Sequence, residues 1–250
     1  ANKAHPCHHC AITREDVNTA RGYQWRDLPM RDPQKLLDAA YRHRDTNDPR
    51  ERARIEERYG VRWSPMLELI GYQHSASNPV DPLHNSFLGM AKSLVNMLLA
   101  NESLFKAGSG LKADQWKRVV QMLPIALYVA WREEESDDIS FEPVEQDPDD
   151  EPAPPEPSTD RRKWYSTILS FCSGIRILHA HSITQQDADD GVQYLSNAAQ
   201  SIIQLDGHLT PNWHIAMHYS QFVRLYGPLH GYGTWPFERN NGVLSRINHN

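Results

Sequence analysis

The chain has 250 residues, of which 39% are hydrophobic, and it carries a formal net charge of -6 at pH 7. This length and apolar content allow one domain with a buried core, or a core that carries a large insertion. No apolar run reaches the roughly 18 residues of a membrane-spanning helix, and the first residues lack the apolar stretch of a secretory signal. Three cysteines are too few for a disulfide framework and favour a reducing, intracellular compartment. A start at alanine suggests a piece of a longer protein.

The charge is unevenly distributed along the chain. Thirteen of the 32 acidic residues lie in segment 133–160 together with six prolines, and this segment contains no Lys or Arg. The remainder of the chain is therefore net positive. A Pro-rich acidic segment buries too little apolar surface to offset its ordering entropy, so it is predicted to be a disordered linker or an exposed loop. Its alternative role is to mimic nucleic acid against a basic surface.

Helical periodicity predicts the elements on both sides of this segment. From Pro33 to Tyr59, Arg alternates with Glu or Asp, which predicts one solvent-exposed helix with i,i+4 ion pairs; contact with DNA is the alternative use of that face. Strand signals are few, and the best of them precedes Asp81. The chain is therefore predicted to be mostly α. Apolar residues recur at helical spacing in five further ranges: 81–97, 112–132, 164–178, 187–205 and 213–225.

The pair Cys7-x-x-Cys10 has the spacing of half a zinc site, because two such thiolates can chelate one tetrahedral ion. Histidines in the same region are candidates for the remaining ligands: His5, His8, His9 and His43. The alternative is two reduced thiols in a flexible N-terminal segment. Cys172 lies among apolar helical residues and is predicted to be a small core residue.

Three polar residues have ordinary structural explanations when each is taken alone. Asp81 followed by Pro82 is typical of a helix N-cap with proline at the first helical position. His84 shares an apolar helical stripe, which favours a core histidine. Glu238 beside Arg239 is typical of a surface ion pair that contributes little stability.

His214 and His218 are four residues apart, so a continuous helix would place both side chains on one face. This spacing can bind a metal, but the glutamate of the zinc-protease motif is absent between them. Structural packing beside an active site is the favoured interpretation, and binding of DNA or metal is the alternative.

Taken together, the local sequences resemble the catalytic domain of CACTA-type DNA transposases, in particular the Plavaka-like group of basidiomycete fungi. Separate blocks occur in the family's order, which makes coincidence improbable. The blocks are Gly60-Val61-Arg62-Trp63-Ser64, Val80-Asp81-Pro82-Leu83-His84-Asn85-Ser86-Phe87-Leu88-Gly89, Thr210-Pro211-Asn212-Trp213-His214, Tyr226-Gly227-Pro228, and Phe237-Glu238-Arg239-Asn240-Asn241-Gly242.

The resemblance implies an RNase H-like fold in which a mixed sheet carries the catalytic acids and a helical insertion separates the second acid from the third. This chain would then hold an incomplete RNase H-like α/β core with a large helical insertion. The implied segments are a Cys-pair segment with a charged helix (1–60), a core segment with the second acid (61–91), the insertion (92–208, interrupted by 133–160), and a core segment with the third acid (209–250).

The resemblance also implies catalytic roles. Asp81 is the second acid and Glu238 the third, and they would hold Mg²⁺ or Mn²⁺ because these hard ions prefer carboxylate and phosphate oxygens. His84 would orient Asp81 or contact the scissile phosphate. Secondary positions in the matching blocks are His214, His218, Arg239 and Asn241. A cysteine pair of the family supports Zn²⁺ at Cys7 and Cys10, although Leu36 or Leu37 stands where the family has a histidine.

One departure concerns the first acid, which should lie well before the cysteine pair, whereas only six residues precede Cys7. The expected function is therefore that of a fragment of a DDE-type transposase. When complete, it would act in the nucleus, cut and join DNA at transposon ends by two-metal catalysis, and work as a homo-oligomer. The alternatives are a catalytically inactive, transposon-derived DNA-binding or protein-interaction module, and an unrelated helical zinc protein.

Overall fold

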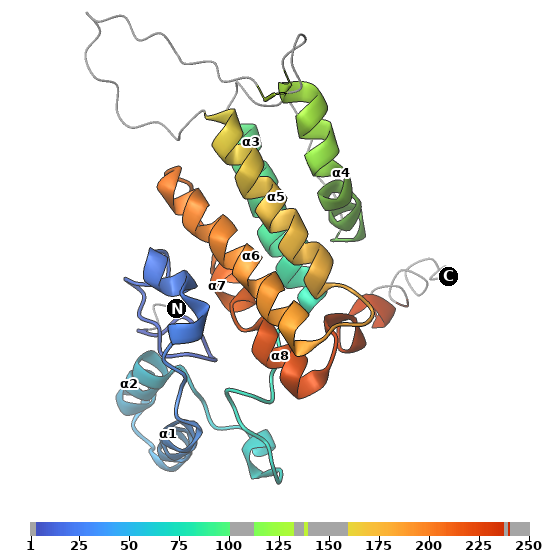
Figure 1. The fold of residues 1–250 in the computed structure, drawn as a ribbon. Coiled ribbons are helices and arrows are strands. Elements are labelled where there is room, and N and C mark those ends of the chain that lie inside the picture. Colours follow the sequence, from blue (N-terminus) through green and yellow to red (C-terminus); the bar gives the residue numbers. More distant parts are fainter. Residues whose placement is uncertain (1–3, 101–112, 133–137, 140–159, 238–239, 241–250) are drawn as a thin grey trace, which may run out of the picture. The chain divides into compact units, whose positions relative to one another are not determined.

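The computed structural model describes residues 4–100, 113–132, 138–139, 160–237 and 240 (Figure 1). The chain divides into two compact units, Ala1–Val80 and Asp81–Asn250. The prediction of a mostly α protein is confirmed, since the described residues are mainly helical and their β pairing is limited to two isolated bridges, Cys10 with Met30 and Arg132 with Ile139. A sheet of the RNase H type is not found among them. Most of the acidic segment 133–160 lies outside the described residues.

The first unit contains a pair of helices, α1 (Pro33–Asp45) and α2 (Pro49–Tyr59). The sequence predicts one helix over 33–59, and this prediction is wrong at residues 46–48. Asp48 is extended because it precedes a proline, and its carboxylate caps α2 by accepting from the amide of Arg50. Asp32 caps α1 in the same way, and Gly60 ends α2 with a left-handed φ of 67°.

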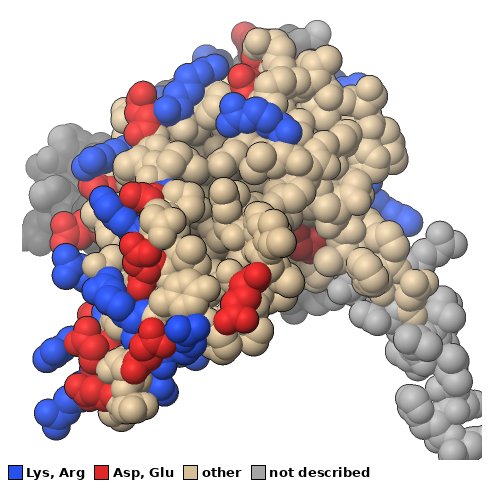
Figure 2. All heavy atoms as spheres, turned by 90° about the horizontal axis from the view of Figure 1, so that it is seen from below, with Lys and Arg blue, Asp and Glu red and all other residues tan. Residues whose placement is uncertain are grey.

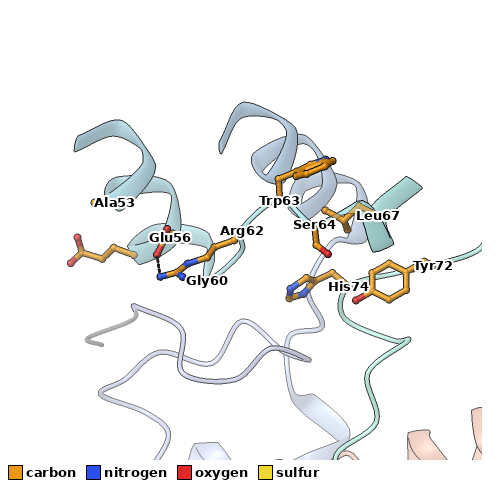
Figure 3. A pocket seen from close by; sticks show the side chains of 10 residues that line it. Ala53, Glu56, Gly60, Arg62, Trp63, Ser64, Leu67, Tyr72 and His74 are labelled. Atoms are coloured by element: carbon orange, nitrogen blue, oxygen red, sulfur yellow. Dashed lines mark ion pairs between the residues drawn. The ribbon is translucent and has the colours of Figure 1, made fainter. Parts of the chain in front are cut away.

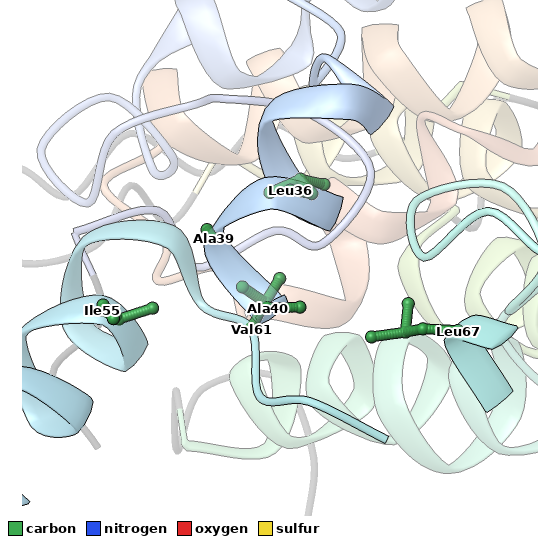
Figure 4. Close-up of a cluster of buried hydrophobic side chains, with 6 residues drawn as sticks. All are labelled: Leu36, Ala39, Ala40, Ile55, Val61 and Leu67. Carbon is green, nitrogen blue, oxygen red and sulfur yellow. The ribbon is translucent and has the colours of Figure 1, made fainter. Parts of the chain in front are cut away.

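The two helices pack over a small apolar core (Figure 4). Alanines on α1 let the helices approach closely, and aliphatic side chains fill the remaining space. Tyr59 and Trp63 pack at its edge. The buried members are Leu36, Ala39, Ala40, Ile55, Val61 and Leu67. Three short 3₁₀ turns complete this unit: η1 (Ala20–Tyr23), η2 (Trp25–Asp27) and η3 (Pro65–Glu68).

The second unit is a bundle of helices. It begins with η4 (His84–Ala91), a π-helical segment that continues into α3 (Lys92–Ala100), and α4 (Ala113–Trp131) follows. Helices α5 (Arg161–Leu178) and α6 (Gln185–Gln204) run side by side in Figure 1 and form the most extensive helix contact. Helix α5 also contacts α4, and η4 contacts α3, α4 and α7. The helices predicted over 81–97, 112–132, 164–178 and 187–205 are therefore confirmed.

The last predicted helix, 213–225, is divided in the structure into α7 (Pro211–Ala216) and α8 (Tyr219–Tyr226). Helix α7 ends at Met217, and His218 begins α8 as its N-cap residue with a φ of -95° and a ψ of 1°. The prediction that His214 and His218 share one continuous helix is therefore wrong. Gly227, with a φ of 79°, ends α8, and the 3₁₀ turn η5 (Leu229–Gly231) follows.

Candidate functional site

Asp81 lies at the start of the helical segment that includes η4, and hydrogen-bond donors surround its carboxylate. The backbone amides of Leu83 and His84 donate to it at 3.4 and 3.1 Å, as an N-cap requires. The amide and the hydroxyl of Thr234, 153 residues further on, donate at 2.9 Å each. His84 Nδ1 donates to the same carboxylate. The predicted cap is confirmed, and the carboxylate also joins two distant segments of the chain.

These hydrogen bonds determine the charge state of Asp81. Burial by itself would raise the pKa of this carboxyl, but the donors of Thr234 and His84 outweigh burial and hold the pKa below its usual value. The His84 side chain is 45% exposed, so the prediction of a core histidine is wrong. Its Nδ1 instead donates to the Asp81 carboxylate, a contact that agrees with the orienting role implied by the resemblance.

The next residues of η4 connect it to α7 and α8. The side-chain amide of Asn85 donates to the carbonyl of Asn212 at 3.1 Å and to the hydroxyl of Tyr219 at 2.9 Å. The Ser86 hydroxyl lies 2.9 Å from the same tyrosine hydroxyl. Burial raises the pKa of Tyr219, so its hydroxyl stays protonated and is available as a donor.

Gly89 explains how closely η4 and α7 approach each other. A Cβ at this position would lie 1.8 Å from the side-chain nitrogen of Asn212, so any larger residue would displace α7. The backbone here is π-helical from His84 to Ala91, a rare conformation that is frequent at functional sites. Two sequence blocks of the resemblance, 80–89 and 210–214, are therefore in direct contact.

An aromatic group covers the side of η4 next to Asp81. The Phe87 ring lies 4.9 Å from the His179 ring and 6.5 Å from the Trp235 ring, and Lys117 Nζ lies 5.8 Å from the Trp235 ring. His179 Nε2 is 2.9 Å from the Ser86 hydroxyl. Burial lowers the pKa of His179 to about 3, and the charge of Lys117 acts in the same direction, so the ring is neutral at pH 7.

The third predicted acid cannot be placed beside Asp81. Glu238, Arg239 and Asn241 lie outside the described residues, which stop at Phe237 and resume only at residue 240. What the structure shows is that Thr234, four positions before Glu238, is hydrogen-bonded to Asp81.

In the first unit, Cys7 and Cys10 are buried and are not in a disulfide. The amide of His9 donates to the Cys7 sulfur at 3.4 Å. The hydrogen bond with Cys7, then burial, and then the charge of Cys7 raise the pKa of the Cys10 thiol. Two buried sulfurs this close cannot both ionise unless a cation balances their charge, which is the situation that a bound metal ion provides.

In the second unit, the imidazoles of His214 and His218 are buried and lie with ring centroids 5.5 Å apart, nearly perpendicular to each other. The break between α7 and α8 turns the two rings edge to face, rather than stacking them along one helix. Among the described residues, the His, Cys, Asp and Glu side chains that could hold a metal ion are Cys7, Cys10, His214 and His218.

The histidines predicted as partners of the cysteine pair are not among them. His43 Nε2 donates to Glu56 at 3.0 Å, which fixes it between α1 and α2. His5 and His9 donate through Nδ1 to the carbonyls of Ile12 and Ser75. The predicted use of His5, His8, His9 or His43 as ligands is therefore not supported. His214 and His218, for which metal binding was the alternative to structural packing, belong to the metal-capable set instead.

The first unit also has a hollow of about 750 Å³ (Figure 3). Trp63, Tyr72 and His74 line one side, and the ion pair of Glu56 with Arg62, at 2.6 Å, closes the other. Glu57 adds a second carboxylate to its wall. Because acidic groups outnumber the cation, the hollow is unsuited to a phosphate.

No protein-family model matches the chain, and neither a curated protein nor a solved structure matches it. In the described part of the chain, every helix is too short or too polar to span a bilayer.

Other residues of the Asp81 region were not predicted from the sequence. Thr234, Tyr219 and His179 contribute donors or rings to it, yet none has a spacing that marks it. Thr234 lies three residues before the block 237–242 of the resemblance, and that position is the one signal that could have found it.

Proposed function

We propose that this chain is part of the catalytic domain of a DDE-type DNA transposase with an RNase H-like core. The observation that supports it most is the pair of hydrogen bonds from Thr234 to Asp81, because Thr234 lies four residues before the proposed third acid and Asp81 is the proposed second acid. The contacts of Asn85 and Gly89 with Asn212 support it as well, since each involves residues that the resemblance singles out. A nuclear protein that acts on transposon ends is the corresponding role.

The described residues do not by themselves fit a Mg²⁺ ion. A Mg²⁺ site needs carboxylate oxygens with open positions. Both oxygens of Asp81 already accept hydrogen bonds, and the metal-capable side chains include no carboxylate. We therefore assign Asp81 to metal binding only in the complete domain, together with Glu238 and DNA phosphates, and derive no catalytic step from it.

The saturated carboxylate favours a second candidate, a transposon-derived module that binds DNA or protein without catalysis. In that role Asp81 serves as a cap and as a tie to Thr234, and the helices are retained for their surfaces. The two candidates differ in whether Asp81 binds a divalent cation when DNA is present.

A structural zinc ion is compatible with both candidate functions, the transposase part and the non-catalytic module. We propose that Cys7 and Cys10 together with His214 and His218 supply the four ligands of one structural Zn²⁺. Each pair alone provides two ligands, and a structural zinc site requires four; two thiolates with two imidazoles is a common set. When bound, the ion would balance the thiolate charge and stabilise the fold. The chain's own residues hold the ligands ready: the His9 amide donates to one sulfur, and the junction between α7 and α8 orients the imidazoles.

The test of catalytic ancestry is Mn²⁺ binding, measured by electron paramagnetic resonance with and without a labelled DNA duplex. For a transposase part, we expect the duplex to strengthen Mn²⁺ binding, and Asp81→Asn and Glu238→Gln to abolish that gain. Asp206→Asn, on an exposed residue, is the matched control and should retain it.

If the chain binds duplex DNA but its Mn²⁺ binding does not depend on Asp81, the catalytic role is wrong and the non-catalytic module is the remaining candidate. If the wild-type chain fails to bind duplex DNA even at 50 mM salt, where phosphate contacts are strong, both DNA roles are wrong.

A further inference from the structure

Three of the seven Lys and Arg side chains on α1 and α2, those of Lys35, Arg44 and Arg54, have an acidic partner within 4 Å. Arg44 pairs with Asp45 at 2.7 Å, and Arg54 pairs with Glu51 at 3.6 Å. On the face seen in Figure 2, Lys and Arg side chains stand beside Asp and Glu side chains. Such pairs neutralise each other and leave little charge for a partner.

Two of the arginines without an acidic partner in the described part of the chain share one aromatic ring. Arg42 near the end of α1 and Arg58 near the end of α2 both stack on the ring of Tyr59, with their guanidinium carbons 5.2 and 5.5 Å from its centroid. Both arginines are exposed, and the structure gives neither a carboxylate partner within the described residues. The charge of Lys35 also acts on the Tyr59 hydroxyl, and its ammonium group pairs with Asp32 at 3.9 Å. We call Lys35, Arg42, Arg58 and Tyr59 the Tyr59 patch.

The pKa of the Tyr59 hydroxyl reflects the cations around it. A hydrogen bond with Arg42, then the charge of Arg58, lower the pKa of Tyr59, and Lys35 acts in the same direction. Burial acts in the opposite direction. The site therefore has an excess of positive charge, because Asp32 pairs with Lys35 while Arg42 and Arg58 have no carboxylate partner among the described residues.

The patch is also held in shape. The carbonyl of Tyr59 accepts from the guanidinium of Arg31 at 2.7 Å, and Tyr59 packs on the buried core of α1 and α2. Stacking on one ring restricts both guanidinium groups, so less conformational entropy is lost when they engage a ligand. Guanidinium forks match phosphate oxygens in a bidentate manner.

From this geometry we propose that the Tyr59 patch is a docking site for the phosphate backbone of duplex DNA. Because both guanidinium groups lie within 5.5 Å of one ring, a single phosphate or two successive phosphates of one strand can engage them together. The inference rests on the proposed DNA role of the chain. It adds a surface in the first unit, distinct from the Asp81 region and from the acidic hollow beside Glu56.

The experiment is a salt titration of duplex binding, followed by fluorescence anisotropy of a labelled duplex of arbitrary sequence. Arg42→Gln/Arg58→Gln removes two charges from the patch, and Arg50→Gln/Arg54→Gln removes two from exposed positions of α2 as the matched control. Circular dichroism confirms that both variants are folded.

We expect the patch variant to lose about tenfold or more in affinity at 50 mM salt, and to show a slope of log K against log salt that is shallower by about 2, one per phosphate contact. The control variant should lose less than about threefold. In the wild type, nuclear magnetic resonance should show the Tyr59 ring signals shifting when DNA is added.

Equal losses in the two variants would show that only net charge matters and would overturn the patch. Wild-type binding that Arg42→Gln/Arg58→Gln leaves unchanged would overturn the patch alone, whereas a wild type that binds no duplex would overturn the proposed function as well. A synthetic peptide of residues 133–160 is added as a competitor. If it binds the wild type but not the patch variant, while both bind DNA equally, the occupant is an acidic peptide and the inference is wrong.

Discussion

A single carboxylate performs two structural tasks at the start of η4. Asp81 caps the helix through the amides of Leu83 and His84, and it ties the helix to Thr234 through two further hydrogen bonds. Each task uses part of the carboxylate's capacity to accept hydrogen bonds, and together they leave it fully occupied. A divalent cation could bind here only by displacing one of these donors.

The tie can be measured by replacing the hydroxyl of Thr234. Thr234→Val removes a donor to Asp81 and should lower the free energy of unfolding by about 1 to 2 kcal/mol, as for other hydrogen bonds to charged groups. Thr210→Val is the matched control, because the buried Thr210 hydroxyl has no hydrogen-bond partner among the described residues. That control should be neutral or slightly stabilising. Urea denaturation of the two variants compares them, and an equal effect in both would show that the tie contributes nothing.

The sequence predicts some of these residues and not others for a physical reason. The cap at Asp81 and Pro82 is local, so residue type and spacing reveal it. The hydrogen bond of Thr234 with Asp81 joins residues 153 positions apart, and that of Tyr219 with Asn85 joins residues 134 positions apart. No periodicity in the sequence encodes such contacts. Only the resemblance, which treats the blocks as one site, indicates that these segments meet.

At the scale of elements, apolar spacing predicts where a helix lies, whereas capping residues and prolines determine where it begins and ends. Pro49 and the cap at Asp48 divide the predicted helix 33–59, although its charge pattern continues through the break. The division between α7 and α8 has no such marker: neither Met217 nor His218 is a helix-breaking residue. Periodicity therefore predicted the first pair of helices and the last pair as single helices.

The contact of α5 with α6 depends on two glycines that face each other. A Cβ at Gly174 would lie 2.8 Å from the Gly191 carbonyl oxygen, and one at Gly191 would lie 2.6 Å from Leu178. Each glycine lets the opposite backbone or side chain approach more closely than alanine would. In the sequence, a glycine inside an apolar helix indicates that another element packs closely there, but the sequence does not identify that element.

Gly191→Ala and Gly174→Ala should therefore destabilise the second unit. Overpacking a buried contact lowers the free energy of unfolding by about 1 to 3 kcal/mol, which exceeds the helix propensity gained, at most about 1 kcal/mol. Gly231→Ala is the matched control, because position 231 is exposed and a Cβ there would meet no atom within 4 Å. Thermal unfolding followed by circular dichroism gives the comparison. If Gly191→Ala is as stable as Gly231→Ala, the helices are farther apart than the structure indicates.

At the scale of the molecule, each compact unit contributes one pair of metal-capable side chains, and neither pair forms a complete zinc site by itself. The cysteine pair is evident from its Cys-x-x-Cys spacing. The histidine pair has a spacing that predicts a shared helix face, which the structure does not have. Assigning the two pairs to one ion is a proposal about the whole chain, which no local pattern could have made.

Removal of the metal tests that assignment. We expect the purified chain to contain one zinc per molecule by elemental mass spectrometry, and both Cys10→Ser and His218→Asn to lose it, because a structural site closes only with four ligands. Cys172→Ser, which removes the remaining cysteine, on α5, is the matched control and should keep the metal. A chelator should lower the midpoint of thermal unfolding by about 10 °C or more, because binding free energy is folding free energy in such a site.

Replacement by Co²⁺ adds a test of geometry, since a tetrahedral site with two thiolates gives strong visible bands together with sulfur-to-cobalt charge transfer. Loss of zinc in Cys10→Ser with full retention in His218→Asn would show that other ligands complete the cysteine pair, and the histidine assignment would then be wrong.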